Sequence, residues 1–100
     1  FHKPCAAHCW TALSHRMCVE AGVDTIEHMV YTDDESTRIV AEAGTPVSPT
    51  LLHRTDHAID VRRKMGSAAN VLKKMKEVQP YCYDSFKRMH QAGVRIFMGP

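Results

Sequence analysis

The chain has 100 residues, 13 of them Lys or Arg and 11 Asp or Glu, and its formal net charge is +2 with neutral histidines. This length allows one domain at most, and a charge so near zero gives no general attraction to nucleic acid or to an anionic membrane. No apolar run approaches the roughly 18 residues of a membrane span, and no segment resembles a signal peptide.

The first segment is typical of a strand followed by a helix. Residues 4–9 carry few side chains larger than a methyl or a thiol, as a strand in a crowded interior requires. Thr11 is the expected N-cap of the helix that follows. Apolar residues recur there at four-residue intervals and predict one buried stripe, made of Leu13, Met17 and Ala21.

At three places an Ala-Gly pair, beginning at residues 21, 43 and 92, joins a helical pattern to a short apolar run. Glycine suits the left-handed position after a helix, and β-branched residues suit a buried strand, so each unit predicts helix, cap and strand. The expected strands span residues 23–28, 45–52 and 94–98. Pro46 and Pro49 each remove a ladder donor, so the second of these strands begins late or is irregular.

The helices between these strands differ in how clearly the sequence marks them. Thr32 and Glu35 form a capping box, and the buried side of the helix they begin is expected to carry Ile39, Val40 and Ala43. Residues 53–66 have the least regular pattern and predict a loop, with Ser67 as a candidate cap for the next helix.

The last helix has the longest apolar stripe in the chain. Its members advance by helical steps over about five turns, and they are Val71, Met75, Val78, Cys82, Phe86 and Met89. Pro80 interrupts this stripe without shifting its phase. A single long helix bent at the proline explains that pattern better than two separate helices.

Four strands alternating with helical crossovers favour a parallel α/β fold. Two topologies remain open, half of a (β/α)8 TIM barrel or most of an open doubly wound sheet. No G-x-G-x-x-G or G-x-x-x-x-G-K loop follows any strand, which favours the barrel. A barrel needs about 250 residues, and the chain has no initiator Met, so we expect residues 1–100 to be part of a longer barrel domain.

Two histidines close neighbouring expected strands, His8 the first and His28 the second. The carboxyl ends of parallel strands face the barrel mouth, so the two imidazoles are expected to converge there. Neutral imidazoles bind divalent ions, and such an ion would lower the pKa of a bound water and polarise a scissile carbonyl. Two histidines need at least one further protein ligand, and a carboxylate to move the proton.

The cysteines allow a second metal hypothesis, a structural zinc cluster. Its candidate ligands are Cys5, His8, Cys9, His15 and Cys18. On a strand, however, Cys5 and Cys9 share one face and His8 takes the other, so one ion does not easily collect all three. The four cysteines also lack the density of a secreted disulfide scaffold, so we expect reduced thiols lining a core and favour a cytoplasmic location.

Five segments together carry a family resemblance: CAAHC from residue 5, EAGVDTIEH from residue 20, DDE from residue 33, EAGTPVSPTL from residue 42 and SFKRMHQAGVRIFMG from residue 85. They resemble the amidohydrolase superfamily, in particular its imidazolonepropionase and Xaa-Pro dipeptidase-like branch. The resemblance is weakest at residues 53–76. It implies strands five to eight of a metal-dependent hydrolase barrel that acts on C–N bonds of a small-molecule amide, cyclic amide or dipeptide.

The resemblance also implies a ligand set for one or two divalent ions, with zinc expected. His8 matches the ligand that ends the fifth strand, and His28 the one that ends the sixth. The other family ligands are a His-x-His pair on the first strand, often a carboxylated lysine on the fourth, and an aspartate after the eighth. Relatives usually have Gly-Thr-Asp there, whereas this chain ends in Gly99-Pro100. The chain alone is therefore expected to be inactive.

Two departures from the family pattern concern the substrate pocket. Met29 stands where glycine usually follows the sixth-strand histidine, and Cys9 and Trp10 follow His8 where relatives often have Ala-His-Gly. Trp10 either walls the pocket or packs under the first helix. His53 either reaches the pocket from the third strand or is a solvated loop residue. The remaining histidines are expected on surface or helix faces, and they are His2, His15, His57 and His90.

Two other classes of function stay open on the sequence. A basic patch could bind nucleic acid, and its members are Arg62, Arg63, Lys64, Lys73, Lys74 and Lys76. No aromatic residues interleave with this patch, which speaks against a stacking surface. The chain could also be a non-catalytic α/β scaffold with structural histidines.

Overall fold

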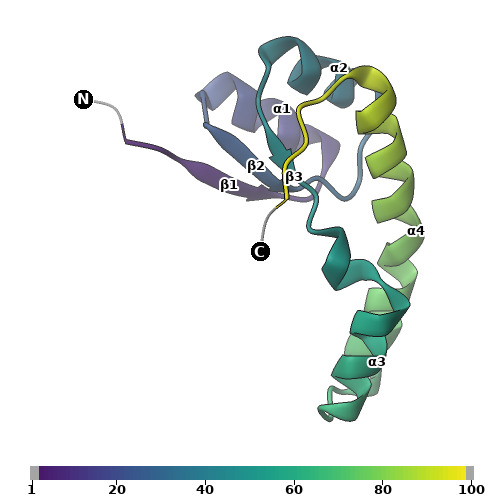
Figure 1. Ribbon diagram of the computed structural model, residues 1–100. Coiled ribbons are helices and arrows are strands. Elements are labelled where there is room, and N and C mark those ends of the chain that lie inside the picture. The colour runs from purple at the N-terminus through teal and green to yellow at the C-terminus, as the bar shows by residue number, and fades with distance from the viewer. Residues whose placement is uncertain (1–2, 99–100) are drawn as a thin grey trace.

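The structure is a computed structural model and describes residues 3–98. Three short parallel strands form a sheet at its centre (Figure 1). The elements in chain order are β1 (Ala6–Cys9), α1 (Ala12–Ala21), β2 (Thr25–His28), α2 (Asp34–Ala43), β3 (Val47–Ser48), the 3₁₀-helix η1 (Leu51–Arg54), α3 (Asp56–Lys64) and α4 (Ala69–Ala92). The predicted α/β class with a parallel sheet is confirmed.

The sheet has the order β1-β2-β3, and both neighbouring pairs are parallel. The predicted strand 94–98 is reduced to a single parallel bridge between Val47 and Ile96. The Val47 N–H donates to the Arg95 carbonyl at 2.8 Å, and the Val47 carbonyl accepts from the Phe97 N–H at 3.0 Å. Because β3 is only two residues long, between Pro46 and Pro49, it offers no further ladder partners.

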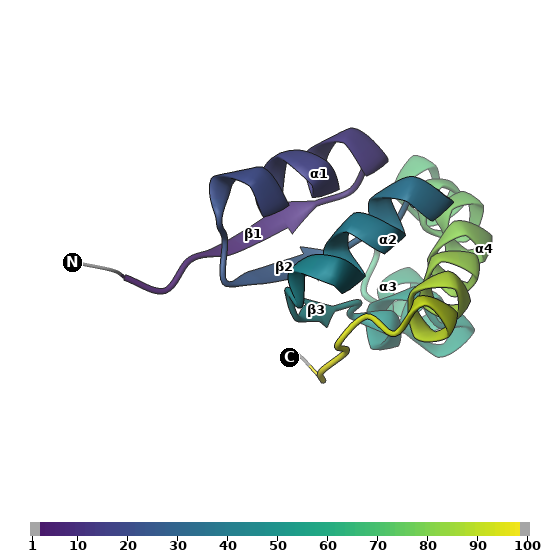
Figure 2. The same ribbon diagram turned by 90° about the horizontal axis from the view of Figure 1, so that it is seen from above.

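Helices α1 and α2 cover one face of this sheet (Figure 2). The buried apolar cluster between the layers comprises Cys9, Ile26, Met29, Val40, Val47, Met89 and Val94. On β1, Cys9 points into this core, whereas Ala6 and His8 are exposed on the opposite face. Val40 is fully buried as predicted, but Ala43 is exposed.

The predicted cap of α1 is confirmed, but its predicted buried stripe is wrong. Thr11 accepts from the Ser14 N–H at 3.3 Å. Leu13 and Met17 are 61% and 59% exposed, whereas His15 is completely buried. Helix α1 lies over the edge strand β1, and among residues 3–98 no element covers its outer side. Periodicity identified an apolar side of the helix but not what that side contacts.

Helix α2 begins one residue later than the capping box predicted. Asp33 is the N-cap and accepts from the Ser36 N–H at 2.7 Å, which lowers the pKa of the Asp33 carboxyl. Thr32 instead donates to the Ser85 hydroxyl at 2.9 Å. Contact with α4 thus occupies the side chain that the sequence pattern assigned to the cap.

The predicted loop over residues 53–66 is wrong, because η1 and α3 fill most of it. Thr55 caps α3 by accepting from the Ala58 N–H at 3.2 Å, and Ile59 is buried. The Gln79 amide of α4 donates to the Arg54 carbonyl at 2.8 Å. One buried apolar residue is too few to give α3 a helical stripe, so tertiary contacts stabilise a helix that its own pattern did not mark.

The long final helix is confirmed as one element that contains Pro80. Its N-cap position is Ala68 without a side-chain hydrogen bond, so the predicted cap at Ser67 is wrong. The first half of α4 lies beside α3, and the two extend away from the sheet (Figure 1). Among residues 3–98, no helix is long and apolar enough to cross a membrane.

Candidate functional site

The two strand-end histidines lie in contact. His8 Nδ1 and His28 Nε2 are 2.9 Å apart, and the ring centroids are separated by 4.9 Å at a 42° tilt. The sheet register pairs Cys9 with His28, so the two rings come from the same end of adjacent strands. The structure therefore brings together the residue pair on which the metal hypothesis depends.

A left-handed backbone conformation at His28 accompanies this meeting. Regular strand alternation would put His28 on the face of Ile26, toward the helices, and away from His8. The φ angle of His28 is +84° and that of Met29 is +51°. This departure from strand geometry allows the His28 ring to turn toward His8, and such strain concentrates at functional sites. It also explains why glycine suits the position that Met29 occupies.

Thr50 contacts the other nitrogen of the His28 ring, and no pattern in the sequence pointed to this contact. The Thr50 hydroxyl donates to the Pro49 carbonyl at 2.7 Å. Its oxygen lies 2.8 Å from His28 Nδ1, and a hydroxyl that donates to Pro49 accepts there from an Nδ1–H. His28 Nε2 is then unprotonated and directs its lone pair toward His8. Thr50 itself has a φ of +52°, unusual for a β-branched residue.

The donor atoms of the pair suit a divalent ion. A tetrahedral zinc ion holds each nitrogen at about 2.0–2.1 Å, which sets two such nitrogens roughly 3.4 Å apart. The observed separation of 2.9 Å would need to widen by only a few tenths of an ångström. Within residues 3–98, no third His, Cys, Asp or Glu joins them in a cluster able to hold a metal. The residue pair Gly99-Pro100 lies outside the described residues.

Local electrostatics favour a neutral His28. Burial is the main cause of its lowered pKa, and the nearby charges of His8 and Arg54 lower the pKa further. His53 acts on His28 in the same direction, although it is exposed on η1. A neutral imidazole keeps the lone pair that metal binding requires.

Trp10 lies beside this pair at the end of β1. Its ring centroid is 6.3 Å from that of His28 and 6.4 Å from that of Tyr31. The central carbon of the Arg54 guanidinium lies over the Trp10 ring, 5.0 Å from the ring centroid. Trp10 remains 37% exposed and lines a pocket with α4. Trp10 therefore lies beside the histidine pair, and a role in a substrate pocket stays a prediction.

The other histidines do not join the pair. His15, expected on a surface or helix face, lies on the buried face of α1 and donates through Nε2 to the Cys9 carbonyl at 3.2 Å. His15 is buried because it lies on the side of α1 that faces β1. His57 and His90 are exposed as predicted, and His2 lies outside the described residues.

The cysteines form no metal site among residues 3–98. All four are free thiols; Cys5 is exposed, whereas Cys9 and Cys82 are buried. Burial raises the pKa of Cys9 to about 12, with a further contribution from the neighbouring Cys18. Burial also raises the pKa of Cys82. Cys9 and Cys82 thus act as small apolar core residues, as the sequence favoured, whereas the exposed Cys5 does not.

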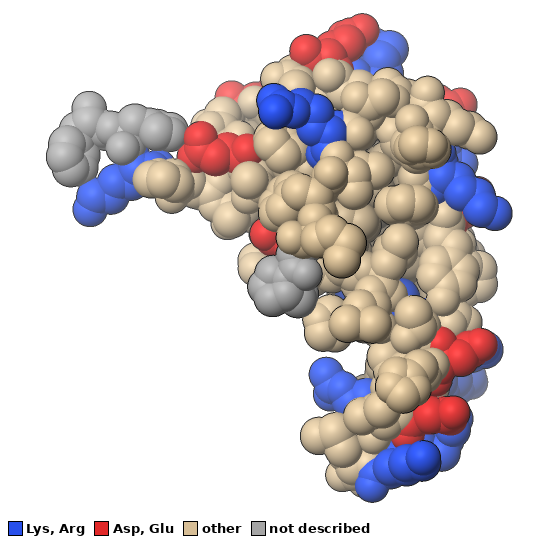
Figure 3. Space-filling model, viewed as in Figure 1, with Lys and Arg blue, Asp and Glu red and all other residues tan. Residues whose placement is uncertain are grey.

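The basic patch on α3 and α4 is mixed with acids. Asp60 pairs with Arg63, and Asp56 pairs with Lys76 at 2.7 Å. Figure 3 shows acidic and basic side chains next to one another at this end of the molecule. An alternating surface of this kind provides no continuous positive stripe for a phosphate backbone.

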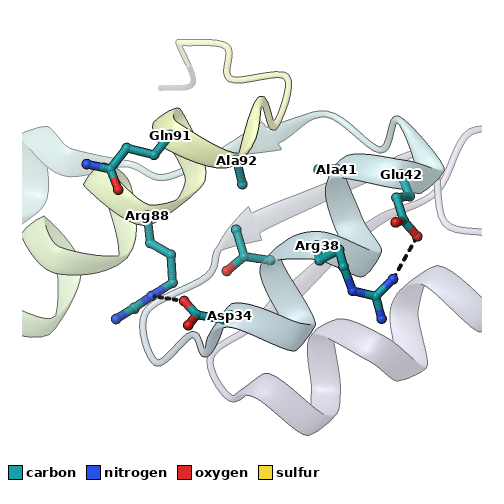
Figure 4. A pocket seen from close by; sticks show the side chains of 8 residues that line it. Asp34, Arg38, Ala41, Glu42, Arg88, Gln91 and Ala92 are labelled. Carbon is teal, nitrogen blue, oxygen red and sulfur yellow. Dashed lines mark hydrogen bonds and ion pairs between the residues drawn. The ribbon is translucent and has the colours of Figure 1, made fainter.

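A separate pocket lies between α2 and α4 (Figure 4). Arg88 reaches Asp34 there at 3.2 Å, and Arg38 reaches Glu42 at 2.9 Å. The charged side chains of this pocket are thus paired with one another, so it offers no unpaired charge to a ligand.

Neither a family model nor a curated protein matches the chain, but solved structures do. An amidohydrolase is 35% identical with a TM-score of 0.82, over 94% of this chain and 22% of that one. A prolidase complexed with N-methylphosphonate-L-proline is 29% identical with a TM-score of 0.82, over 94% and 23%. A Xaa-Pro dipeptidase with bound methionine in its active site is 29% identical with a TM-score of 0.76, over 94% and 23%. This chain therefore spans less than a quarter of each.

Proposed function

We propose that this chain, whose motifs and fold both match part of an amidohydrolase superfamily domain, belongs to a metal-dependent hydrolase of C–N bonds. His8 and His28 are two of its metal ligands. The substrates are small molecules with an amide, cyclic amide or dipeptide bond. The observation that carries this proposal is the 2.9 Å approach of His8 Nδ1 to His28 Nε2.

The chain's own residues supply the orientation that such a site needs. Thr50 holds the Nδ1–H of His28, so that Nε2 offers its lone pair at the rim of the sheet. Ligand histidines need their second nitrogen satisfied in this way, because the partner fixes the tautomer and the ring orientation. A divalent ion held there supplies a nucleophilic water at neutral pH and polarises the scissile carbonyl. Trp10, with its ring centroid 6.3 Å from that of His28, bounds the site on one side.

Further ligands and the proton-transfer carboxylate belong to other parts of the complete domain. Two imidazoles alone leave a zinc ion with at least two open positions, one more than catalytic zinc sites keep. We therefore expect the chain to bind a metal ion without turning over an amide substrate.

Metal titration of the chain tests the proposal. Zn²⁺ binding is measured by calorimetry for the wild type and for His8→Ala and His28→Ala. His57→Ala is the matched control, because His57 is an exposed histidine on α3. We expect each site variant to lose measurable binding, whereas the control keeps it. Equal Zn²⁺ binding by all four proteins would favour the scaffold with structural histidines and refute the proposed function.

A further inference from the structure

Glu27 is a half-buried residue on the face of the sheet that α1 and α2 leave uncovered. The sheet register pairs it with His8 of β1 on one side and with Ser48 of β3 on the other. Residues in register on parallel strands share a face, and the neighbouring residues Cys9 and Ile26 point into the core instead. One row across the three strands therefore carries an imidazole, a carboxylate and a hydroxyl.

Two groups of this row have no partner among residues 3–98. The Glu27 carboxylate makes neither a hydrogen bond nor an ion pair within that range. Ser48 is completely buried, and its hydroxyl oxygen has no hydrogen-bond partner there either. Polar groups removed from water are almost always hydrogen-bonded, so two such groups on neighbouring strands call for an explanation. Glu27 is also the one acidic residue within the described strands β1, β2 and β3.

The proton on His8 must change its position when a metal ion binds to the histidine pair. The Thr50 oxygen accepts from the Nδ1–H of His28, so His28 Nε2 is an acceptor, and its 2.9 Å contact requires a proton on His8 Nδ1. An ion bound by His8 Nδ1 and His28 Nε2 takes the place of that proton. A neutral His8 then carries its proton on Nε2, and this N–H needs an acceptor of its own.

We propose that Glu27, held by the Ser48 hydroxyl, accepts the Nε2–H of metal-bound His8 and thereby orients this ligand. The inference rests on the proposed function and makes Glu27 a positioning residue, neither a metal ligand nor the proton-transfer group. Glu27 is close enough to act on the pair, because burial lowers the pKa of His28 and the Glu27 charge opposes that effect. A carboxylate that accepts from a ligand histidine fixes its tautomer and raises its basicity, which strengthens the metal bond.

Calorimetric Zn²⁺ titration measures what Glu27 contributes to the affinity. Glu27→Met keeps the length of the side chain but removes the acceptor, and we expect it to bind Zn²⁺ about 10- to 100-fold more weakly than the wild type. Glu27→Gln keeps an acceptor oxygen without the charge and should recover part of this loss. Glu20→Met, which removes an exposed carboxylate of α1, is the matched control and should bind Zn²⁺ as the wild type does.

Nitrogen NMR of His8 provides a readout that a merely structural role of Glu27 would not change. On Zn²⁺ binding, the His8 proton should move from Nδ1 to Nε2, and the Nε2–H should exchange with water more slowly in the wild type than in Glu27→Met. Metal-free Glu27→Met should keep the Nδ1–H of His8, which shows that the variant folds. Coordination of Zn²⁺ through His8 Nε2, or equal exchange rates in the two proteins, overturns the role of Glu27.

A double-mutant cycle tests whether Ser48 acts through Glu27. Ser48→Ala should weaken Zn²⁺ binding in the wild type but not in Glu27→Met, and an equal loss in both backgrounds refutes the link between the two residues. The His8→Ala variant separates this inference from the proposed function. If His8→Ala loses Zn²⁺ and Glu27→Met binds it as the wild type does, the metal site stands and the positioning role is wrong. If the wild type binds no Zn²⁺, both are wrong.

Discussion

Replacing Thr50 with valine removes a single hydroxyl from the proposed metal site. Valine keeps the β-branched shape of threonine, so the unusual backbone at this position experiences the same strain. The Nδ1–H of His28 then loses its acceptor at 2.8 Å, and the Nε2 lone pair is no longer held toward His8. Loss of an outer hydrogen-bond partner lowers metal affinity by about 10- to 100-fold, which corresponds to roughly 1.4–2.8 kcal/mol.

Calorimetric Zn²⁺ titration measures that change, and nitrogen NMR of His28 reports the tautomer in the metal-free chain. Thr50→Ser is the control, because serine keeps the hydroxyl and should keep both the Nδ1–H tautomer and most of the affinity. The reasoning fails if Thr50→Val binds Zn²⁺ as tightly as Thr50→Ser, or if His28 retains one tautomer without the hydroxyl.

Three further predictions concern stability and thiol chemistry. Met29→Gly relieves a left-handed backbone strain of about 1 kcal/mol, but it also removes a fully buried side chain whose loss costs about 2–5 kcal/mol. Urea denaturation should therefore show a net loss of stability, and an unchanged urea midpoint would contradict this balance. Burial lowers the pKa of His15 below its ordinary 6.5, so the unfolded chain binds more protons. The contribution of neutral His15 to the free energy of unfolding is complete above pH 6.5, and it is lost as the pH falls toward the pKa of His15 in the folded chain. Urea midpoints between pH 8 and 5 should therefore fall less in His15→Gln than in wild type, and parallel curves would count against a buried neutral imidazole. Iodoacetamide at pH 8 should label Cys5 well before Cys9 or Cys82, as peptide mass spectrometry can determine, and equal rates would contradict their burial.

The sequence correctly predicted those features of the fold that depend only on neighbouring residues. The glycines at 22, 44 and 93 all take the left-handed conformation after a helix, as the Ala-Gly pattern indicated. The sustained stripe of α4 was long enough to outweigh Pro80. Where an element depends on partners far along the chain, the sequence was less informative. Thr32, for example, was the predicted N-cap of α2, but its side chain instead donates to the hydroxyl of Ser85, 53 residues away.

The candidate site was predictable in its residue types but not in its geometry. Strand ends and register were enough to place His8 and His28 near one another. The left-handed turn at His28 was not predicted, because positive φ is uncommon for any residue except glycine, and the several-fold enrichment of histidine there is too weak a signal by itself. Thr50 and Arg54 were also missed, since each acts through a contact made only when η1 and α4 come together beside the strand ends. The sequence analysis named His53 as the candidate pocket residue in this segment and passed over its neighbour Arg54.

Pro80 divides α4 into two lengths with separate surroundings. A proline has no N–H, so the Lys76 carbonyl four residues earlier lacks its usual donor within the helix. Beyond this point Ser85 and Met89 pack toward the sheet, and before it Val71 and Lys74 line the pocket beside Trp10. Bending at Pro80 costs less than bending an unbroken helix, so the half of α4 beside α3 can take its own direction while the half beyond Pro80 stays packed on the sheet.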